Sequence, residues 1–204
     1  MIKYIIFDLD GVLFDGCEFH ANMFMEALWT VLGKTALTKE YHDTHLNGLS
    51  TKKKLEVLQI GKEEAQRISD LKQELTKTNI HRYIRPDVKI QTICIELLKL
   101  GYTLYCVSNS IRDTVLTCLK GLGILQLFTC IISNEDVKEP KPSPEPYLTL
   151  YKKYNMLPSE CLIIEDSPHG IESARKSGGN VLTVLNCNDV TLDKILNNIF
   201  FYTK

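Results

Sequence analysis

The sequence IKYIIFDLDG, residues 2–11, decides the fold of this chain. Its first six residues are rich in β-branched and aromatic side chains and stop at a turn signal, which predicts a buried strand over residues 2–7. Asp8 and Asp10 then leave the carboxyl end of that strand, where open α/β sheets place their ligands. Two carboxylates one residue apart repel each other unless a cation or a proton is present. Most such triplets are solvated turns, so the rest of the chain must show whether this one is a site.

The composition is that of an ordinary globular protein. Its 204 residues accommodate one sizeable domain, or a core domain with a smaller insert. A net charge of -1 and an isoelectric point near 6.5 indicate no nucleic-acid or membrane partner through charge. No apolar stretch approaches the roughly 20 residues that span a bilayer. The seven cysteines are scattered without a Cys-x-x-Cys pair, so we expect free thiols and a cytoplasmic location.

A long stretch after the first strand contains no convincing strand. Apolar residues recur there at helical spacing, Gly33 and Gly61 fall between helical segments, and Thr38 and Ser50 are suited to cap helix N-termini. This pattern predicts a small all-helical insert of about four helices, a cap over residues 16–82.

The remainder, residues 1–15 and 83–204, alternates helix and strand. Alternation of this kind implies right-handed crossovers and a parallel sheet covered on both faces. We therefore predict an α/β fold with a Rossmann-like, doubly wound parallel sheet as its core. The further strands are expected over residues 102–107, 128–132, 161–164 and 181–184.

Polar clusters follow two of these later strands. Ser108-Asn109 follows the second strand and Glu165-Asp166 the fourth, and Lys141 lies between them in a loop whose flanking prolines restrict the backbone. Each cluster alone is as well explained by helix capping or by an exposed loop. Because the carboxyl ends of parallel strands share one edge, their joint occurrence with Asp8 and Asp10 predicts a site.

Together these residues resemble the haloacid dehalogenase-like hydrolase superfamily, in the branch with a helical cap after the first strand that includes phosphoglycolate phosphatases and β-phosphoglucomutases. The resemblance covers essentially the whole chain, and most members act on phosphate esters. The four matching motifs are Asp8-Leu9-Asp10-Gly11-Val12-Leu13, Ser108-Asn109, Lys141 with Pro142 and Pro144, and Glu165-Asp166-Ser167 with Gly170.

The resemblance implies a role for each acid. Asp8 is the expected nucleophile, which forms an aspartyl-phosphate, and Asp10 the general acid and then the base that activates water. We expect the negative charge of Asp8 to raise the pKa of Asp10. Mg2+ is the expected cofactor, bound by the Asp8 carboxylate, the main-chain carbonyl of Asp10 and Asp166. Glu165 is expected to assist through a water or as an outer ligand.

Other residues are implied in binding the phosphate ester. Ser108 and the backbone amide of Asn109 would hold the phosphoryl oxygens, while Lys141 offsets the charge of Asp8 and of the transferred group. His20 begins the first cap helix, where it either reaches the substrate or supports Asp10 or is simply a helix histidine. Thr51 lies in a cap turn similar to the specificity loop of the family, at a position where phosphomutases usually carry arginine.

The expected function is a Mg2+-dependent phosphatase of a small phosphorylated metabolite, of the sugar phosphate or phosphoglycolate type. Two alternatives stay open at this point. One is a sugar phosphomutase, which returns the phosphoryl group to the sugar, and the other is a binding or regulatory protein without turnover. We expect a monomer whose only partner is the small-molecule phosphate ester.

Overall fold

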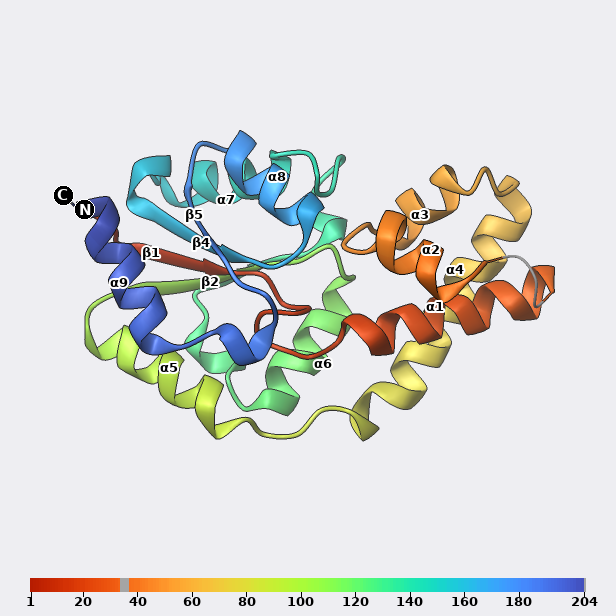
Figure 1. The fold of residues 1–204 in the computed structure, drawn as a ribbon, viewed down its shortest axis with the longest axis horizontal. Helices are drawn as coiled ribbons and strands as arrows, with labels where there is room; N and C mark the ends of the chain where they lie inside the picture. The colour runs from red at the N-terminus through yellow and green to blue at the C-terminus, as the bar shows by residue number, and fades with distance from the viewer. Residues whose placement is uncertain (34–36, 204) are drawn as a thin grey trace.

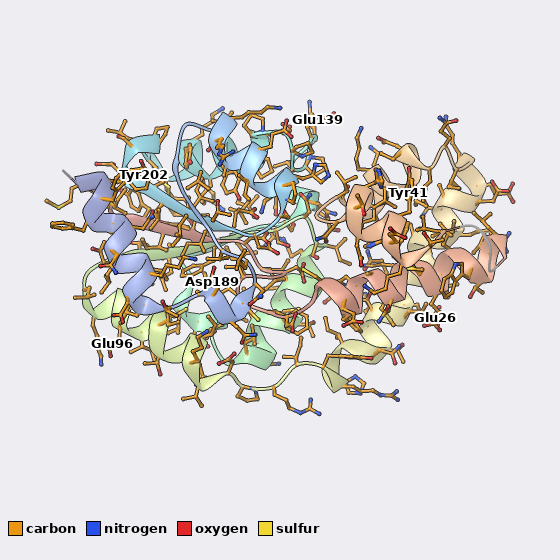
Figure 2. The ribbon with its side chains drawn as sticks, in the orientation of Figure 1. Glu26, Tyr41, Glu96, Glu139, Asp189 and Tyr202 are labelled. Atoms are coloured by element: carbon orange, nitrogen blue, oxygen red, sulfur yellow. The ribbon has the colours of Figure 1, made fainter. Side chains whose placement is uncertain are left out.

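The computed structural model describes residues 1–33 and 37–203, and Figure 1 shows two parts joined side by side. One part is a sheet with helices on both faces, and the other, called here the helical lobe, consists of α1 to α4. In Figure 2, Glu26 and Tyr41 lie on the helical lobe, whereas Glu96 and Asp189 lie on the sheet-bearing part. Within the described ranges, none of the helices has the length and apolar character needed to cross a membrane.

The elements follow the predicted order. In chain order they are β1 (Tyr4–Phe7), α1 (Cys17–Leu32), α2 (Lys39–Tyr41), η1 (His42–Leu46), α3 (Thr51–Val57), α4 (Lys62–Asn79), η2 (Ile80–Arg82), α5 (Val88–Lys99), β2 (Thr103–Val107), α6 (Arg112–Leu122), η3 (Leu125–Leu127), β3 (Cys130–Ile132), η4 (Asn134–Asp136), α7 (Glu145–Tyr154), η5 (Pro158–Glu160), β4 (Cys161–Glu165), α8 (Pro168–Lys176), β5 (Asn180–Thr183), η6 (Cys187–Asp189) and α9 (Leu192–Thr203).

The sheet has the order β3-β2-β1-β4-β5 and its strands pair in parallel. The predicted α/β, Rossmann-like doubly wound fold is confirmed. The strand β1 lies at the centre of the sheet, where its apolar side chains from Ile5 to Phe7 are fully buried. The chain runs from β1 outward through β2 to β3 and then returns to β4 on the other side of β1. The carboxyl ends of β1 and β4 therefore meet where the winding reverses, the usual ligand position in such sheets.

Two apolar clusters sandwich the sheet. One joins β1 and β2 to α5, α6 and α9, and the other joins the opposite sheet face to α7 and α8. The predicted strand 128–132 is shortened to β3 because Phe128 follows directly from the turn η3 and packs edge-on against Phe7, with ring centroids 6.1 Å apart.

The helical lobe has an apolar core of its own. Its buried centre is built from α1, the segment before α3, and α4. The two expected caps are present, since the Thr38 side chain accepts a hydrogen bond from the amide of Tyr41 and that of Ser50 from the amide of Lys53. Gly33 ends α1, whereas Gly61 begins α4 instead of ending α3, which stops at Val57. Residues 34–36 of the predicted cap lie outside the described residues.

Candidate active site

Three acids meet at the carboxyl edge of the sheet. Asp8 follows β1, Glu165 is the last residue of β4, and Asp166 comes next; one ligand oxygen from each lies within 4.8 Å of the others. Gly11 makes this approach possible, since a Cβ there would lie 2.0 Å from Oδ2 of Asp166 and its φ of +86° favours glycine. The turn after β1 and the turn after β4 thus pack against each other without an intervening side chain.

Lys141 reaches into this acidic cluster from the loop before α7. Its side chain is buried, and its Nζ donates to Oδ1 of Asp8 at 2.7 Å, to Oε1 of Glu165 at 2.5 Å and to the carbonyl oxygen of Val107 at 2.7 Å. The hydroxyl of Tyr147 donates to the same Glu165 oxygen at 2.9 Å. Glu165 therefore orients Lys141 toward Asp8. Tyr147 was not predicted from the sequence, where it reads as an ordinary apolar-face residue of α7.

Asn109 fixes the loop that carries Lys141. The side-chain oxygen of Asn109 accepts from the Lys141 amide at 3.0 Å, and its Nδ2 donates to the Lys141 carbonyl at 3.1 Å and to the Gly48 carbonyl at 2.9 Å. The Asn109 side chain is consequently used inside the protein, and the backbone amide is the group left to meet a ligand. Ser108 is buried beside it, and its Oγ accepts from the amide of Ser110.

Asp10 is held from both sides. The hydroxyl of Ser110 donates to its Oδ2 at 3.1 Å, and Nε2 of His20 lies 3.1 Å from its Oδ1. Of the interpretations left open for His20, this position favours support of Asp10. Ser110 was not singled out in the sequence, although it immediately follows the Ser108-Asn109 motif.

The electrostatics of the acids differ from one to another. Burial, together with Glu165, raises the pKa of Asp8 well above its usual range against the opposing charge of Lys141. Burial and the neighbouring Glu165 and Asp10 raise the pKa of Asp166 to about 7. Although burial also disfavours its ionisation, Lys141 keeps a raised pKa because Asp8 and Glu165 stabilise the ammonium.

The expectation of a raised Asp10 pKa was wrong. Burial raises it, but the positive charge and contact of His20, the Ser110 hydroxyl and the charge of Lys72 outweigh burial, and the pKa is lowered. His20 and Lys72 belong to the helical lobe. Asp8 is the nearest charged neighbour of Asp10 in the sequence, whereas the pKa of Asp10 depends on charges that the fold brings from α1 and α4.

A cavity opens between the sheet edge and the helical lobe. It encloses about 730 Å3 of space, its open mouth included. Most of the predicted site residues line this cavity: Asp8, Asp10, His20, Thr51, Ser108, Asn109 and Lys141. The helical lobe also contributes Lys54, Lys72 and Gln73 to its wall. Thr51 is half-buried at the start of α3.

The donor set fits a divalent cation. Oδ1 of Asp166 is buried without a hydrogen-bond partner, and the carboxylate of Asp8 lies beside it, so two hard oxygen ligands face each other. Glu165 is less available, because Lys141 and Tyr147 engage its Oε1 and the Asp166 amide contacts its Oε2 at 3.3 Å. The raised pKa values of Asp8 and Asp166 follow first from burial and then from neighbouring carboxylates whose charge Lys141 only partly offsets.

Comparison with known proteins gives consistent similarities. A model of the family described as haloacid dehalogenase-like hydrolase matches residues 5–184. The chain is 30% identical to the putative phosphatase YhcW of Bacillus subtilis over 190 residues, covering 91% of this chain and 84% of that protein. It is 37% identical to pyrophosphatase PpaX of Bacillus velezensis over 83 residues, which span 41% of this chain and only 38% of that relative. A crystal structure of β-phosphoglucomutase from Clostridium difficile has a TM-score of 0.83 at 23% identity, over 100% of this chain and 99% of that one.

Proposed function

Because the chain belongs to the haloacid dehalogenase-like hydrolase family, we propose that it is a Mg2+-dependent phosphatase that hydrolyses a small phosphorylated metabolite through an aspartyl-phosphate. The observation that carries the proposal is the contact of Lys141 with both Asp8 and Glu165 at the sheet edge where Asp166 also lies. The buried ammonium of Lys141 donates to one oxygen of the Asp8 carboxylate, which orients that carboxylate for nucleophilic attack and opposes the rise in its pKa that burial causes.

The first step belongs to Asp8 and Asp10. A carboxylate oxygen of Asp8 attacks phosphorus, the bond from phosphorus to the ester oxygen breaks, and that oxygen takes a proton from Asp10. Ser108, the Asn109 amide and Lys141 stabilise the charge on the phosphoryl oxygens. Mg2+, held by Asp8, the Asp10 carbonyl and Asp166, would supply further positive charge at these oxygens when bound.

In the second step, water attacks phosphorus, Asp10 accepts its proton and the bond to Asp8 breaks, which releases inorganic phosphate. The lowered pKa of Asp10 in the substrate-free protein favours the ionised form that this step needs. An incoming phosphate is itself negative and raises the pKa of a nearby acid, which favours the protonated form that the first step needs.

We also propose that residues 16–82 act as a cap that excludes water from the cavity, with hinges at Asp15-Gly16 and residues 82–86. The lobe touches the core at the carbonyl of Gly48, which accepts from Asn109. A Cβ on Gly48 would lie 2.8 Å from the Oγ of Ser167, so this contact is close. Exclusion of water strengthens every electrostatic contact at the sheet edge.

The proposed function is tested by phosphate release from a panel of phosphate esters, including p-nitrophenyl phosphate, with Mg2+ and after chelation. We expect Mg2+-dependent release of inorganic phosphate. A hexose 1-phosphate belongs in the panel, because an isomerised sugar without free phosphate would instead identify a phosphomutase. Inactivity across the whole panel would favour a binding protein without turnover.

We expect Mg2+ to stabilise the fold increasingly as the pH rises. The ordinary pKa of aspartate is 3.8 and that of folded Asp166 is about 7, so between these values the metal-free folded protein keeps a proton that the unfolded chain has lost. The free energy of unfolding of the metal-free protein therefore falls with rising pH in this window, by up to about 1.4 kcal/mol per pH unit. Asp8 contributes in the same direction. Mg2+ binds the ionised carboxylates and should remove this loss.

Urea unfolding at several pH values between 5 and 8, with EDTA or with Mg2+, measures this effect. The variant Asp166→Asn should show a weaker pH dependence in EDTA and a smaller gain from Mg2+. Equal stabilisation by Mg2+ at pH 5 and pH 8, unchanged in Asp166→Asn, would argue against this metal site.

A further inference from the structure

The part of the cavity wall that the helical lobe contributes is basic. Lys54 on α3 and Lys72 on α4 both line the cavity that also contains Asp8 and Lys141, and they are only 8% and 7% exposed. Both come from the helical lobe, from elements separated by the loop before α4. Lysine is seldom buried to this extent unless a partner offsets the loss of hydration.

Neither lysine has a carboxylate partner among the described residues. In the part that the structure describes, no carboxylate forms an ion pair with either ammonium group. The acid whose charge acts most on both lysines is Asp10, whose Oδ2 accepts from the Ser110 hydroxyl and whose Oδ1 lies 3.1 Å from Nε2 of His20. Burial lowers the pKa of Lys72, and burial with the charge of Lys72 lowers the pKa of Lys54 to about 8. Lys54 is thus still mostly protonated at neutral pH.

Lys54 is also held in place. Its Nζ lies 2.8 Å from Nε2 of His42, which is almost fully buried, and Nδ1 of His42 lies 3.2 Å from Oδ1 of Asp43. Burial and the Lys54 charge lower the pKa of His42, which keeps the imidazole neutral. A neutral ring that donates from Nδ1 to Asp43 accepts at Nε2 from Lys54. The ring of Phe24 lies 5.2 Å from the same Nζ.

A polar atom without a partner among the described residues lies on the same wall of the cavity. Oε1 of Gln73, the neighbour of Lys72 on α4, is buried and makes no hydrogen bond with the described residues. Buried polar groups in folded proteins are almost always satisfied by protein, water or ligand. Two ammonium groups without a carboxylate partner among the described residues, and an unsatisfied amide oxygen on the same wall, therefore indicate a wall built for a polar, anionic ligand group.

From this arrangement we propose that the substrate is a phosphate monoester with a second anionic group, a carboxylate or another phosphate, which Lys54 and Lys72 bind while the ester phosphate lies against Asp8. This inference rests on the proposed function and names the substrate class of the same site. His42 acts as a positioning residue for Lys54.

A competing role for these lysines is to support Asp10 alone, since the charge of Lys72 helps to lower its pKa. The two roles differ in what a variant changes. Loss of support for Asp10 lowers turnover of every substrate alike, whereas loss of an anion subsite weakens only substrates that carry the second anion, chiefly through KM.

The test compares matched esters that differ in the second anion. One pair is 2-phosphoglycolate and ethyl phosphate, and the other is 1,3-propanediol bisphosphate and propyl phosphate. The variants are Lys54→Gln and Lys72→Gln, with Lys53→Gln as the control, because Lys53 lies on the same helix with a half-exposed side chain paired to Glu56. In one of the two pairs, we expect kcat/KM of the wild type to be about 30-fold or more higher for the ester with the second anion than for its uncharged partner, the effect of one buried charge contact.

Lys54→Gln and Lys72→Gln should lose most of that preference, and Lys53→Gln should keep it. The pair that shows the preference identifies the second anion as carboxylate or phosphate. If p-nitrophenyl phosphate is hydrolysed in an Asp8-dependent way but neither pair shows a preference for its charged member, the inference is overturned and the proposed function stands. An equal loss of kcat in Lys54→Gln for both members of a pair would have the same consequence.

Calorimetric titration of the charged and uncharged esters into Asp8→Asn keeps the inference testable if no ester is hydrolysed. Tighter binding of the charged ester, abolished by adding Lys54→Gln, would support the subsite even if the proposed function failed. Equal binding of both esters would overturn it.

Discussion

Replacing Asp8 by asparagine is expected to abolish phosphate release while the protein stays folded. The amide cannot act as the nucleophile, so the aspartyl-phosphate cannot form, and kcat should fall by about four orders of magnitude or more. The fold should tolerate the change because burial and Glu165 already disfavour the ionised form of Asp8. Lys141 also keeps its contacts with Glu165 and the Val107 carbonyl. Steady-state phosphate release and a thermal unfolding curve measure the two expectations.

The matched control is Asp193→Asn, an exposed aspartate in the first turn of α9, remote from the cavity. It should keep wild-type turnover and stability. Wild-type rates in Asp8→Asn would show that another group attacks phosphorus. A collapse of its unfolding curve would show instead that Asp8 is needed for folding, and then the loss of activity would not identify a nucleophile.

Replacing Lys141 by methionine should damage both turnover and stability. Asp8 and Glu165 would remain buried without the cation that now touches both, and removal of one partner from a buried pair typically costs about 3–5 kcal/mol. Turnover should also fall by about 10²- to 10³-fold, the effect of losing a group that stabilises transition-state charge. Both effects follow from the single ammonium that links the nucleophile to Glu165.

The sign of the pH dependence separates this mechanism from a simple packing defect. Protonation of Asp8, whose pKa is raised, relieves the unpaired negative charge, so Lys141→Met should lose more stability at pH 8 than at pH 5. The wild-type lysine stays charged over that range because its pKa is raised. Lys138→Met, an exposed lysine of the same loop, is the control and should behave as wild type. A loss of stability that is constant with pH would point to packing alone.

The fold was predictable because its signals are local. The apolar run before Asp8 and the regular alternation after Pro86 depend on residues close together in the sequence, and periodicity reports them directly. The ends of the strands were less predictable. Glu165 belongs to β4 although its side chain is charged, because Lys141 and Tyr147 satisfy it inside the protein.

The meeting of Asp8, Asp166 and Lys141 was also predictable, since strand ends in a parallel sheet share an edge. Asp8, Asp166 and Lys141 are indeed brought together there. Tyr147, Ser110 and the pair Lys54 and Lys72 were missed. In the sequence, Tyr147 has the pattern of a core aromatic residue, Ser110 that of a loop serine, and the two lysines that of a charged helix face. Nothing within a few residues distinguishes them from ordinary residues of these kinds.

The sequence by itself determined the sheet, the helical insert and the residues that meet at the sheet edge, because these follow from periodicity and from the order of elements along the chain. Only the tertiary structure decided the charge state of Asp10 and the burial of Lys54 and Lys72. Asp10 is separated by 100 residues from Ser110, and its pKa also depends on His20 and Lys72 of the helical lobe. Such quantities are sums over charges and solvent exclusion in three dimensions, so no local stretch of sequence contains them.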